Sequence, residues 1–144
     1  MRNQRGPLVV MADDDDDDCI IARDAFEESK ARGAILCVED GMELLDYLSH
    51  SGKYAGETDA PLPALILLDL NMPRKDGREV LKDIKSIPAF QNIPIVVLTT
   101  SREEKDIIFS RKAGADAFIT KPSSFSEWVD IMRTLAQDWL HGDN

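Results

Sequence analysis

The 144-residue sequence has little that would build a disulfide framework, a zinc finger or a membrane span. Its two cysteines, Cys19 and Cys37, match no CxxC or zinc spacing, and its two histidines, His50 and His141, have no companion at metal-ligand or catalytic spacing. No apolar run approaches the roughly 18 residues that a transmembrane helix needs, and the polar N-terminus lacks the apolar core of a secretory signal. We therefore expect two free thiols, a reducing compartment and a cytoplasmic protein.

Basic residues are also in the minority, since 17 Lys and Arg face 27 Asp and Glu, for a formal net charge of −10. Nucleic-acid binding requires Lys and Arg gathered on one face to contact phosphates, and the sequence contains no such cluster. Six of the acids are consecutive, at positions 13–18. We therefore expect neither nucleic-acid nor membrane partners, and the acidic run becomes the feature to explain.

The hydrophobic pattern predicts one α/β domain. Short apolar runs alternate with segments of helical period, which indicates five βα units around a parallel sheet. We expect a flavodoxin-like, doubly wound sheet with strand order 2-1-3-4-5. The first seven residues are expected to form a flexible tail and residues 8–144 a single domain. The expected strands are 8–12, 34–38, 64–68, 95–98 and 115–119, and the expected helices are 18–31, 41–51, 78–86, 102–112 and 125–140, with stop signals at Gly33, Gly52 and Gly114.

The expected last helix, 125–140, is apolar over about half of its circumference at 100° per residue. A helix that covers one face of a sheet needs less apolar surface than this. Deep packing inside the domain is the simpler interpretation, and contact of one edge of this face with a second protomer or a partner is the alternative.

Polar side chains follow nearly every expected strand. In open parallel sheets ligands bind beyond the carboxyl ends of the strands, so these side chains are expected to converge. Glu39 and Asp40 follow an edge strand and are expected to lie outside the cluster. The converging residues are Asp13 and Asp14 after the first strand, Asp69 after the third, Thr99 and Thr100 after the fourth, and Thr120, Lys121 and Pro122 after the fifth.

Three converging carboxylates repel one another and therefore require a cation. Hard oxygen ligands in this number suit Mg²⁺ with several retained waters, with Mn²⁺ as a substitute. Together with Lys121 the metal would neutralise the three acids, so that the pocket can accept a phosphoryl group. Asp69, alone at the end of the run LILLD, is the best candidate for a carboxylate nucleophile that forms an aspartyl phosphate. The turn-rich segment after it, beginning at Asn71, can bring a backbone carbonyl to the metal.

The acidic run is expected to divide between the metal and a helix. Positions 15–18 would lie at the N-terminus of the first helix, where carboxylates cap free N–H groups and favour the helix dipole. That leaves Asp13 and Asp14 for the metal. A calcium-binding EF-hand loop is excluded because its sixth position must be Gly and is Asp18 here.

These residues resemble the receiver domain of two-component response regulators over nearly the whole chain. The resemblance rests on the acidic pair Asp13-Asp14, on Asp69 within LLDLNMPRKDG, on Thr99 after IVVL and on Lys121-Pro122 after AFIT. The resemblance implies that Asp69 is the phosphoacceptor and that Asp14, Asp69 and the Asn71 backbone carbonyl bind Mg²⁺ directly, with Asp13 acting mainly through water. It also implies that Lys121 and Thr99 contact the phosphoryl group and that Phe118 turns inward with Thr99. The Lys121–Pro122 bond is cis in the family, but the sequence leaves its isomer open here.

The resemblance implies a signalling switch, not a classical enzyme. A histidine kinase or histidine phosphotransfer protein would donate the phosphoryl group, and the chain would assist its own phosphorylation and dephosphorylation. The face formed by 102–112, 115–119 and 125–140 would then change its binding preference. Since the sequence shows no output domain, the message is expected to travel by protein contact, and a homodimer through the same face is a further hypothesis. The most similar subgroup is that of the single-domain regulators associated with phytochromes.

A phosphatase and a phosphorylation-independent adaptor are the two alternatives to a signalling switch. A phosphatase of the haloacid-dehalogenase type needs a second Asp two positions after the nucleophile, and Asn71 at that position cannot act as a general acid. A phosphorylation-independent adaptor would keep the receiver fold without its chemistry, and failure to bind Mg²⁺ would favour it.

Overall fold

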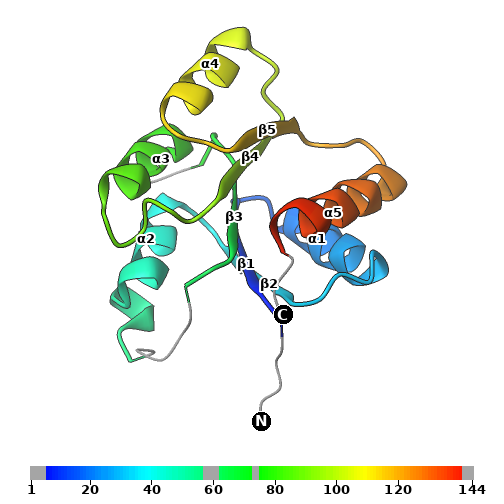
Figure 1. The fold of residues 1–144 in the computed structure, drawn as a ribbon, viewed down its shortest axis with the longest axis horizontal. Coiled ribbons are helices and arrows are strands. Elements are labelled where there is room, and N and C mark those ends of the chain that lie inside the picture. Colours follow the sequence, from blue (N-terminus) through cyan, green and yellow to red (C-terminus); the bar gives the residue numbers. More distant parts are fainter. Residues whose placement is uncertain (1–5, 57–61, 73–74, 141–144) are drawn as a thin grey trace.

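The computed structural model describes residues 6–56, 62–72 and 75–140 and has a five-stranded parallel sheet between two layers of helices (Figure 1). The strand order is β2-β1-β3-β4-β5, which confirms the predicted flavodoxin-like fold. The predicted flexible tail falls largely outside the described residues. In chain order the elements are β1 (Leu8–Ala12), α1 (Asp16–Glu28), β2 (Ala34–Val38), α2 (Gly41–Ser49), η1 (Gly52–Tyr54), β3 (Leu65–Leu68), α3 (Gly77–Ser86), β4 (Ile95–Thr99), α4 (Glu104–Lys112), β5 (Ala117–Thr120) and α5 (Phe125–Trp139).

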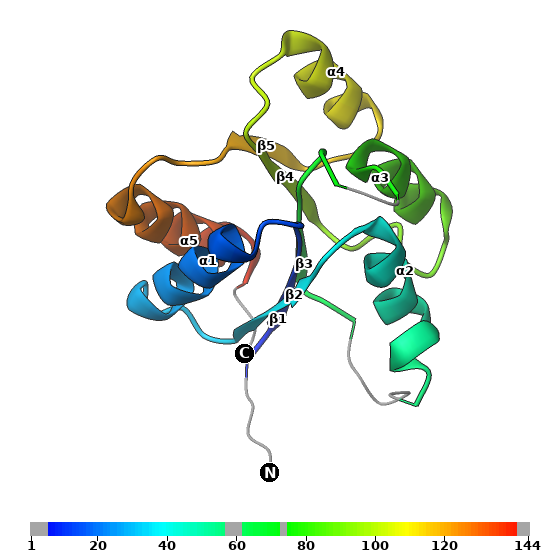
Figure 2. The same cartoon turned by 180° about the vertical axis from the view of Figure 1, so that it is seen from behind.

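The two faces of the sheet carry separate hydrophobic cores. Helices α1 and α5 lie side by side on one face, and α2, α3 and α4 lie on the other (Figures 1 and 2). Because successive strand residues point to opposite faces, Val9 belongs to the core under α1 and α5, whereas Val10 belongs to the core under α2 and α3. The central strands β1, β3 and β4 are therefore apolar on both faces.

Several element boundaries differ from those expected from sequence, and each difference has a local cause. Helix α1 begins at Asp16 because the Asp15 carboxylate caps it, accepting from the Asp18 N–H at 3.1 Å. It ends at Glu28, and Lys30 then turns the chain with a φ of 66°, before Gly33 is reached. Helix α2 ends at a left-handed His50 (φ 56°), so the glycine expected as its stop lies beyond the cap. Short side-chain and backbone contacts at helix ends thus override the glycine signals.

The two cysteines form a disulfide between α1 and β2, so the expectation of free thiols was wrong. The Cα atoms of Cys19 and Cys37 are 6.5 Å apart, within the 4.4–6.8 Å that a disulfide spans. A separation of 18 residues says nothing about this contact, because it arises only when α1 folds back beside β2. The argument from cysteine usage for a reducing compartment therefore loses its support.

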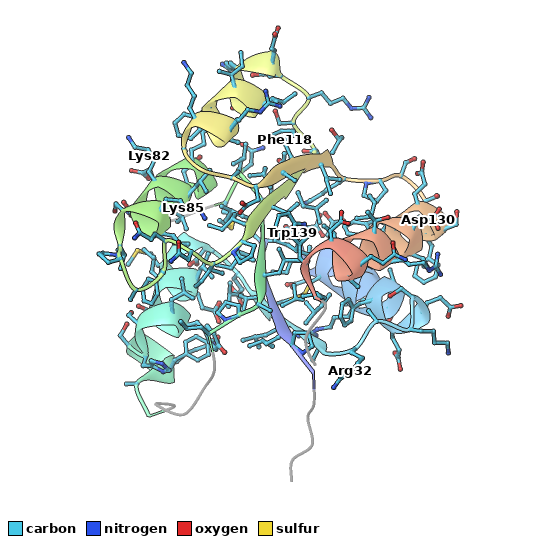
Figure 3. The ribbon with its side chains drawn as sticks, in the orientation of Figure 1. Arg32, Lys82, Lys85, Phe118, Asp130 and Trp139 are labelled. Carbon is cyan, nitrogen blue, oxygen red and sulfur yellow. A yellow bond between two sulfur atoms is a disulfide. The ribbon has the colours of Figure 1, made fainter. Side chains whose placement is uncertain are left out.

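Most of the apolar face of α5 packs inside the domain. Trp128, Met132 and Leu135 are buried in the core shared with α1, and Trp139 is half-buried near the end of the helix (Figure 3). Phe125 is the exception, with 48% of its surface exposed. Packing inside the domain thus accounts for nearly all of the apolar surface on α5. No helix among residues 6–56, 62–72 and 75–140 is long and apolar enough to cross a membrane.

Candidate phosphoryl-acceptor and metal site

Backbone hydrogen bonds beyond the strand ends fix the positions of the predicted site residues. The N–H of Asp13 donates to the Val38 carbonyl at 3.0 Å, and the N–H of Asp69 donates to the Ala12 carbonyl at 3.0 Å. On the other side of the site, the N–H of Lys121 donates to the Thr99 carbonyl at 2.8 Å. The carboxyl ends of β1, β3, β4 and β5 therefore bring these side chains to one edge of the sheet.

Three carboxylates meet at this edge. One oxygen from each of Asp13, Asp14 and Asp69 lies within 4.8 Å of the others. Asp13 and Asp69 are buried, with 4% and 6% of their surface exposed, whereas Asp14 is exposed. Buried carboxylates this close need a compensating cation, and an all-oxygen donor set with one open side fits a divalent metal that retains waters. The donor chemistry of the site is thus suited to such an ion.

Lys121 is the cation that the chain itself supplies. Its ammonium nitrogen lies 2.7 Å from Asp13 Oδ2, 2.7 Å from Asp18 Oδ2 and 3.3 Å from Asp69 Oδ2, and only 7% of its side chain is exposed. Burial alone would lower the pKa of Lys121, but the hydrogen bonds to Asp13 and Asp18 more than offset it and raise the pKa above its usual range. The ammonium therefore stays charged at neutral pH.

Asp13 has a strongly perturbed carboxyl group. Burial raises its pKa to about 6, against the lowering effect of Lys121 and of the Asp15 N–H, which donates to Asp13 Oδ1 at 2.9 Å. The charge of nearby Asp69 adds to the rise. Without a metal ion, this carboxyl group binds a proton close to neutral pH.

Asp18 is the site residue that sequence reasoning missed. The sequence assigned it to capping the first helix, but Asp15 is the cap and Asp18 supplies only the backbone N–H that Asp15 accepts from. The Asp18 carboxylate instead contacts Lys121, which is 103 residues away in the chain. Its place in the first turn of α1, at the same sheet edge as the acidic pair, is the only signal that pointed toward the site.

The other predicted residues lie at the same edge with different degrees of burial. Thr99 is fully buried and its hydroxyl accepts from the Ser101 N–H at 3.4 Å, whereas Thr100 is exposed. Asn71 is exposed and its N–H donates to Asp69 Oδ1 at 3.3 Å. Glu39 and Asp40, expected outside the cluster, are not part of the three-carboxylate group, and Asp40 caps α2.

Phe118 lies on β5 between the sheet and α4 (Figure 3). It is half-buried and lines a cavity of about 120 Å³ together with Ser110 of α4. The sequence left the isomer of the Lys121–Pro122 bond open, and no peptide bond within the described residues is cis.

A charged network joins α3, α4 and the loop between β4 and α4. Arg78 of α3 donates to both carboxylate oxygens of Asp106 in α4, at 3.0 and 2.9 Å, and Ser101 donates to Asp106 Oδ2 at 2.6 Å. Arg78 also reaches the Leu70 carbonyl at 3.4 Å. The network was not visible in the sequence, because α3 and α4 meet only in the folded chain.

Replacing Asp106 by Ala is expected to lower the free energy of unfolding by about 2 kcal/mol, because it leaves Arg78 and Ser101 without their buried acceptor. The bonds to Arg78 and Ser101 lower the pKa of Asp106. The difference between wild type and variant should therefore be complete above the ordinary Asp pKa of about 3.9 and shrink as the pH falls below it. Urea unfolding at several pH values measures both effects. Asp130→Ala is the matched control, since its pair with Arg133 is exposed; an equal loss in both variants would contradict the assignment.

Comparison with known proteins agrees with this geometry. The family model for the response regulator receiver domain matches residues 9–133. The response regulator Rcp1 of a Synechocystis strain is 33% identical over 133 residues, covering 92% of this chain and 88% of that protein. The Mn²⁺-bound crystal structure of Rcp1 superposes with a TM-score of 0.83 at 32% identity, covering 96% of this chain and 97% of that one. The phosphorylated cyanobacterial phytochrome response regulator RcpA gives a TM-score of 0.86 at 38% identity, covering 97% and 98%.

The fold and the acidic edge of the sheet agree with the family match. The chain belongs to the response regulator receiver domain family. It is similar to the phytochrome-associated members, including the regulator RPA3017 in red light signalling of R. palustris, with a TM-score of 0.86 and 33% identity over 96% of both chains. Receiver domains are phosphoacceptors of two-component signalling that interact with histidine kinases.

Proposed function

We propose that this chain is a phosphorylation-operated switch that accepts a phosphoryl group on Asp69 in a Mg²⁺-dependent reaction. The observation that carries the proposal is the surroundings of Asp69: it is buried, two further carboxylates offer oxygens within 4.8 Å, and the Lys121 ammonium lies 3.3 Å away. The phosphorylated structure of RcpA and the Mn²⁺-bound structure of Rcp1 support the same chemistry by similarity.

The reaction is an in-line transfer. A carboxylate oxygen of Asp69 attacks the phosphorus of a phosphohistidine, the P–N bond breaks as the P–O bond forms, and the histidine nitrogen leaves. Asp13, Asp14, Asp69 and the backbone carbonyl of Asn71 would hold the metal ion. When bound, it stabilises negative charge on the transferring group. The Lys121 ammonium can do the same, because it lies 3.3 Å from Asp69 Oδ2.

Phosphorylation then changes the surface around α4 and β5. The phosphoryl group replaces one negative charge with about two, which attracts hydrogen-bond donors. The buried Thr99 hydroxyl at the end of β4 would turn toward the phosphoryl group and give up its contact with the Ser101 N–H. Phe118 would turn into its neighbouring cavity in the same step.

The partners and setting follow from this chemistry. The donor would be a sensor histidine kinase or a histidine phosphotransfer protein, and similarity to RcpA and RPA3017 favours a kinase of the phytochrome type. A cytoplasmic location rests on that donor alone, because the disulfide removes the argument from free thiols. Residues 8–144 would act as one receiver domain that signals by protein contact. A homodimer through α4, β5 and α5 stays a prediction; Ile108 and Phe125 are its exposed apolar residues on these helices.

Incubation with acetyl phosphate and Mg²⁺ is expected to add one phosphoryl group to the intact protein, because the site supplies both an acceptor and charge compensation. Intact-mass spectrometry measures the adduct, and the same sample with a metal chelator is the control. An adduct that forms equally well in chelator would contradict the role of the metal. A folded protein that forms no adduct and binds no Mg²⁺ would instead support the phosphorylation-independent adaptor.

A further inference from the structure

We propose that Asp18 is a positioning residue that holds Lys121 back from Asp69 and thereby weakens the binding of the phosphoryl group. The proposal rests on the proposed function and adds a fourth acid to it. The ammonium of Lys121 has three hydrogens and faces three carboxylates. Asp13 and Asp18 are both at 2.7 Å, whereas Asp69 is at 3.3 Å. The lysine is thus bound more closely to two other acids than to the acceptor.

Among the described residues, no other contact requires the Asp18 carboxylate to point at the lysine. The N-terminal turn of α1 is already capped by Asp15. Asp18 is not a member of the three-carboxylate group that can hold a metal. Its side chain keeps 23% of its surface exposed, so solvent could satisfy it without Lys121. The Asp18–Lys121 pair therefore serves the site and not the helix.

Asp18 is also fixed in place. The next residue, Cys19, is joined by the disulfide to Cys37 of β2, and α1 packs along α5. When Lys121 turns toward a phosphoryl group on Asp69, the first turn of α1 cannot follow it. The contact of Lys121 with Asp18 must then lengthen or break, and its energy opposes the phosphoryl-bound state.

The charge balance points the same way. With Asp18, the site holds four carboxylates against the charges of Lys121 and one divalent metal ion, so one negative charge remains in excess before the phosphoryl group arrives. Loss of this charge should favour an anion at the site. Two separate effects, the competition for Lys121 and the excess charge, therefore predict that removal of the Asp18 carboxylate tightens phosphoryl binding.

The test is the affinity for beryllofluoride, an equilibrium analogue of the phosphoryl group, measured by calorimetry in saturating Mg²⁺. Asp18→Asn is expected to tighten binding about tenfold, the scale of one charge-assisted hydrogen bond. Asp17→Asn is the matched control: it removes the same charge from the neighbouring, exposed position and should change the affinity less than about twofold. Asp18→Glu, which keeps the charge, should restore most of the wild-type affinity.

Each outcome decides a separate question. If Asp18→Asn and Asp17→Asn raise the affinity for beryllofluoride equally, the effect is one of long-range charge alone, and the positioning role is overturned. Weaker binding by Asp18→Asn would show that Asp18 aids Lys121 and would overturn it too. Circular dichroism checks folding, and Asp18→Ala is the second variant if Asp18→Asn does not fold. Absence of beryllofluoride binding by the wild type would contradict the proposed function itself, which the wild-type titration shows before any variant is compared.

Discussion

Replacement of Asp69 by Asn is expected to abolish the phosphoryl adduct while leaving the protein folded. The amide has nearly the shape of the carboxylate, so the packing at the end of β3 should survive, but its oxygen is a poor nucleophile toward phosphorus. The neighbouring acids do not replace it. Asp13 is held by Lys121 and by the Asp15 N–H, and Asp14 is exposed to water.

Intact mass after incubation with acetyl phosphate and Mg²⁺ measures this result, and peptide mapping of the wild type locates the adduct. Asp17→Asn is the control, because it carries the same change of charge on the exposed side of α1. It should keep the full adduct. If Asp69→Asn forms as much adduct as the wild type, the acceptor is another member of the acidic cluster.

The fold was predictable because its strands are nearly continuous apolar runs. The runs ending at Ala12, Val38 and Leu68 have no polar interruption, as expected for strands covered on both faces. The predicted ends of these strands differ from the observed ends by at most one residue. The last strand was predicted to begin at Ala115, two residues before the start of β5. There Asp116 accepts from the Ile95 N–H at 2.9 Å and fixes the turn before β5. A side chain that closes a turn in this way leaves no mark on hydropathy.

The site was predictable as far as it follows from topology. Parallel strands end at one edge of the sheet, so Asp13, Asp69 and Lys121 could be brought together from their positions after apolar runs. Contacts between helices or between a helix and a distant strand could not. The Asp18–Lys121 and Arg78–Asp106 pairs join residues 103 and 28 positions apart, and the disulfide depends on the angle at which α1 returns along β2. These contacts depend on three-dimensional packing that no local pattern encodes.

The affinity for a divalent metal is expected to fall as the pH drops below about 6, approaching tenfold per pH unit. Burial raises the pKa of Asp13 to about 6, and a metal ion competes with that proton for the negative charge. Above this pKa the carboxyl group is ionised and the affinity should level off. Calorimetric titration with Mg²⁺ or Mn²⁺ at pH 5, 6, 7 and 8 measures the profile. Asp13→Asn should bind metal more weakly and show a flatter profile, whereas Asp17→Asn should keep the wild-type slope; a flat wild-type profile from pH 5 to 7 would refute the role of Asp13.

The same carboxyl group links metal binding to stability. Because the pKa of Asp13 is higher in the folded than in the unfolded chain, its contribution to stability is complete below the ordinary value of about 3.9 and is lost as the pH rises through about 6. A shift of this size corresponds to up to about 3 kcal/mol. The metal-free protein should thus lose stability between about pH 4 and pH 6, as the buried Asp13 carboxyl group ionises beside Asp69. Mg²⁺ should restore the lost stability above about pH 6, because the ion binds the folded cluster once the Asp13 carboxyl group is ionised. Urea unfolding with and without Mg²⁺ from pH 4 to 8 measures both effects.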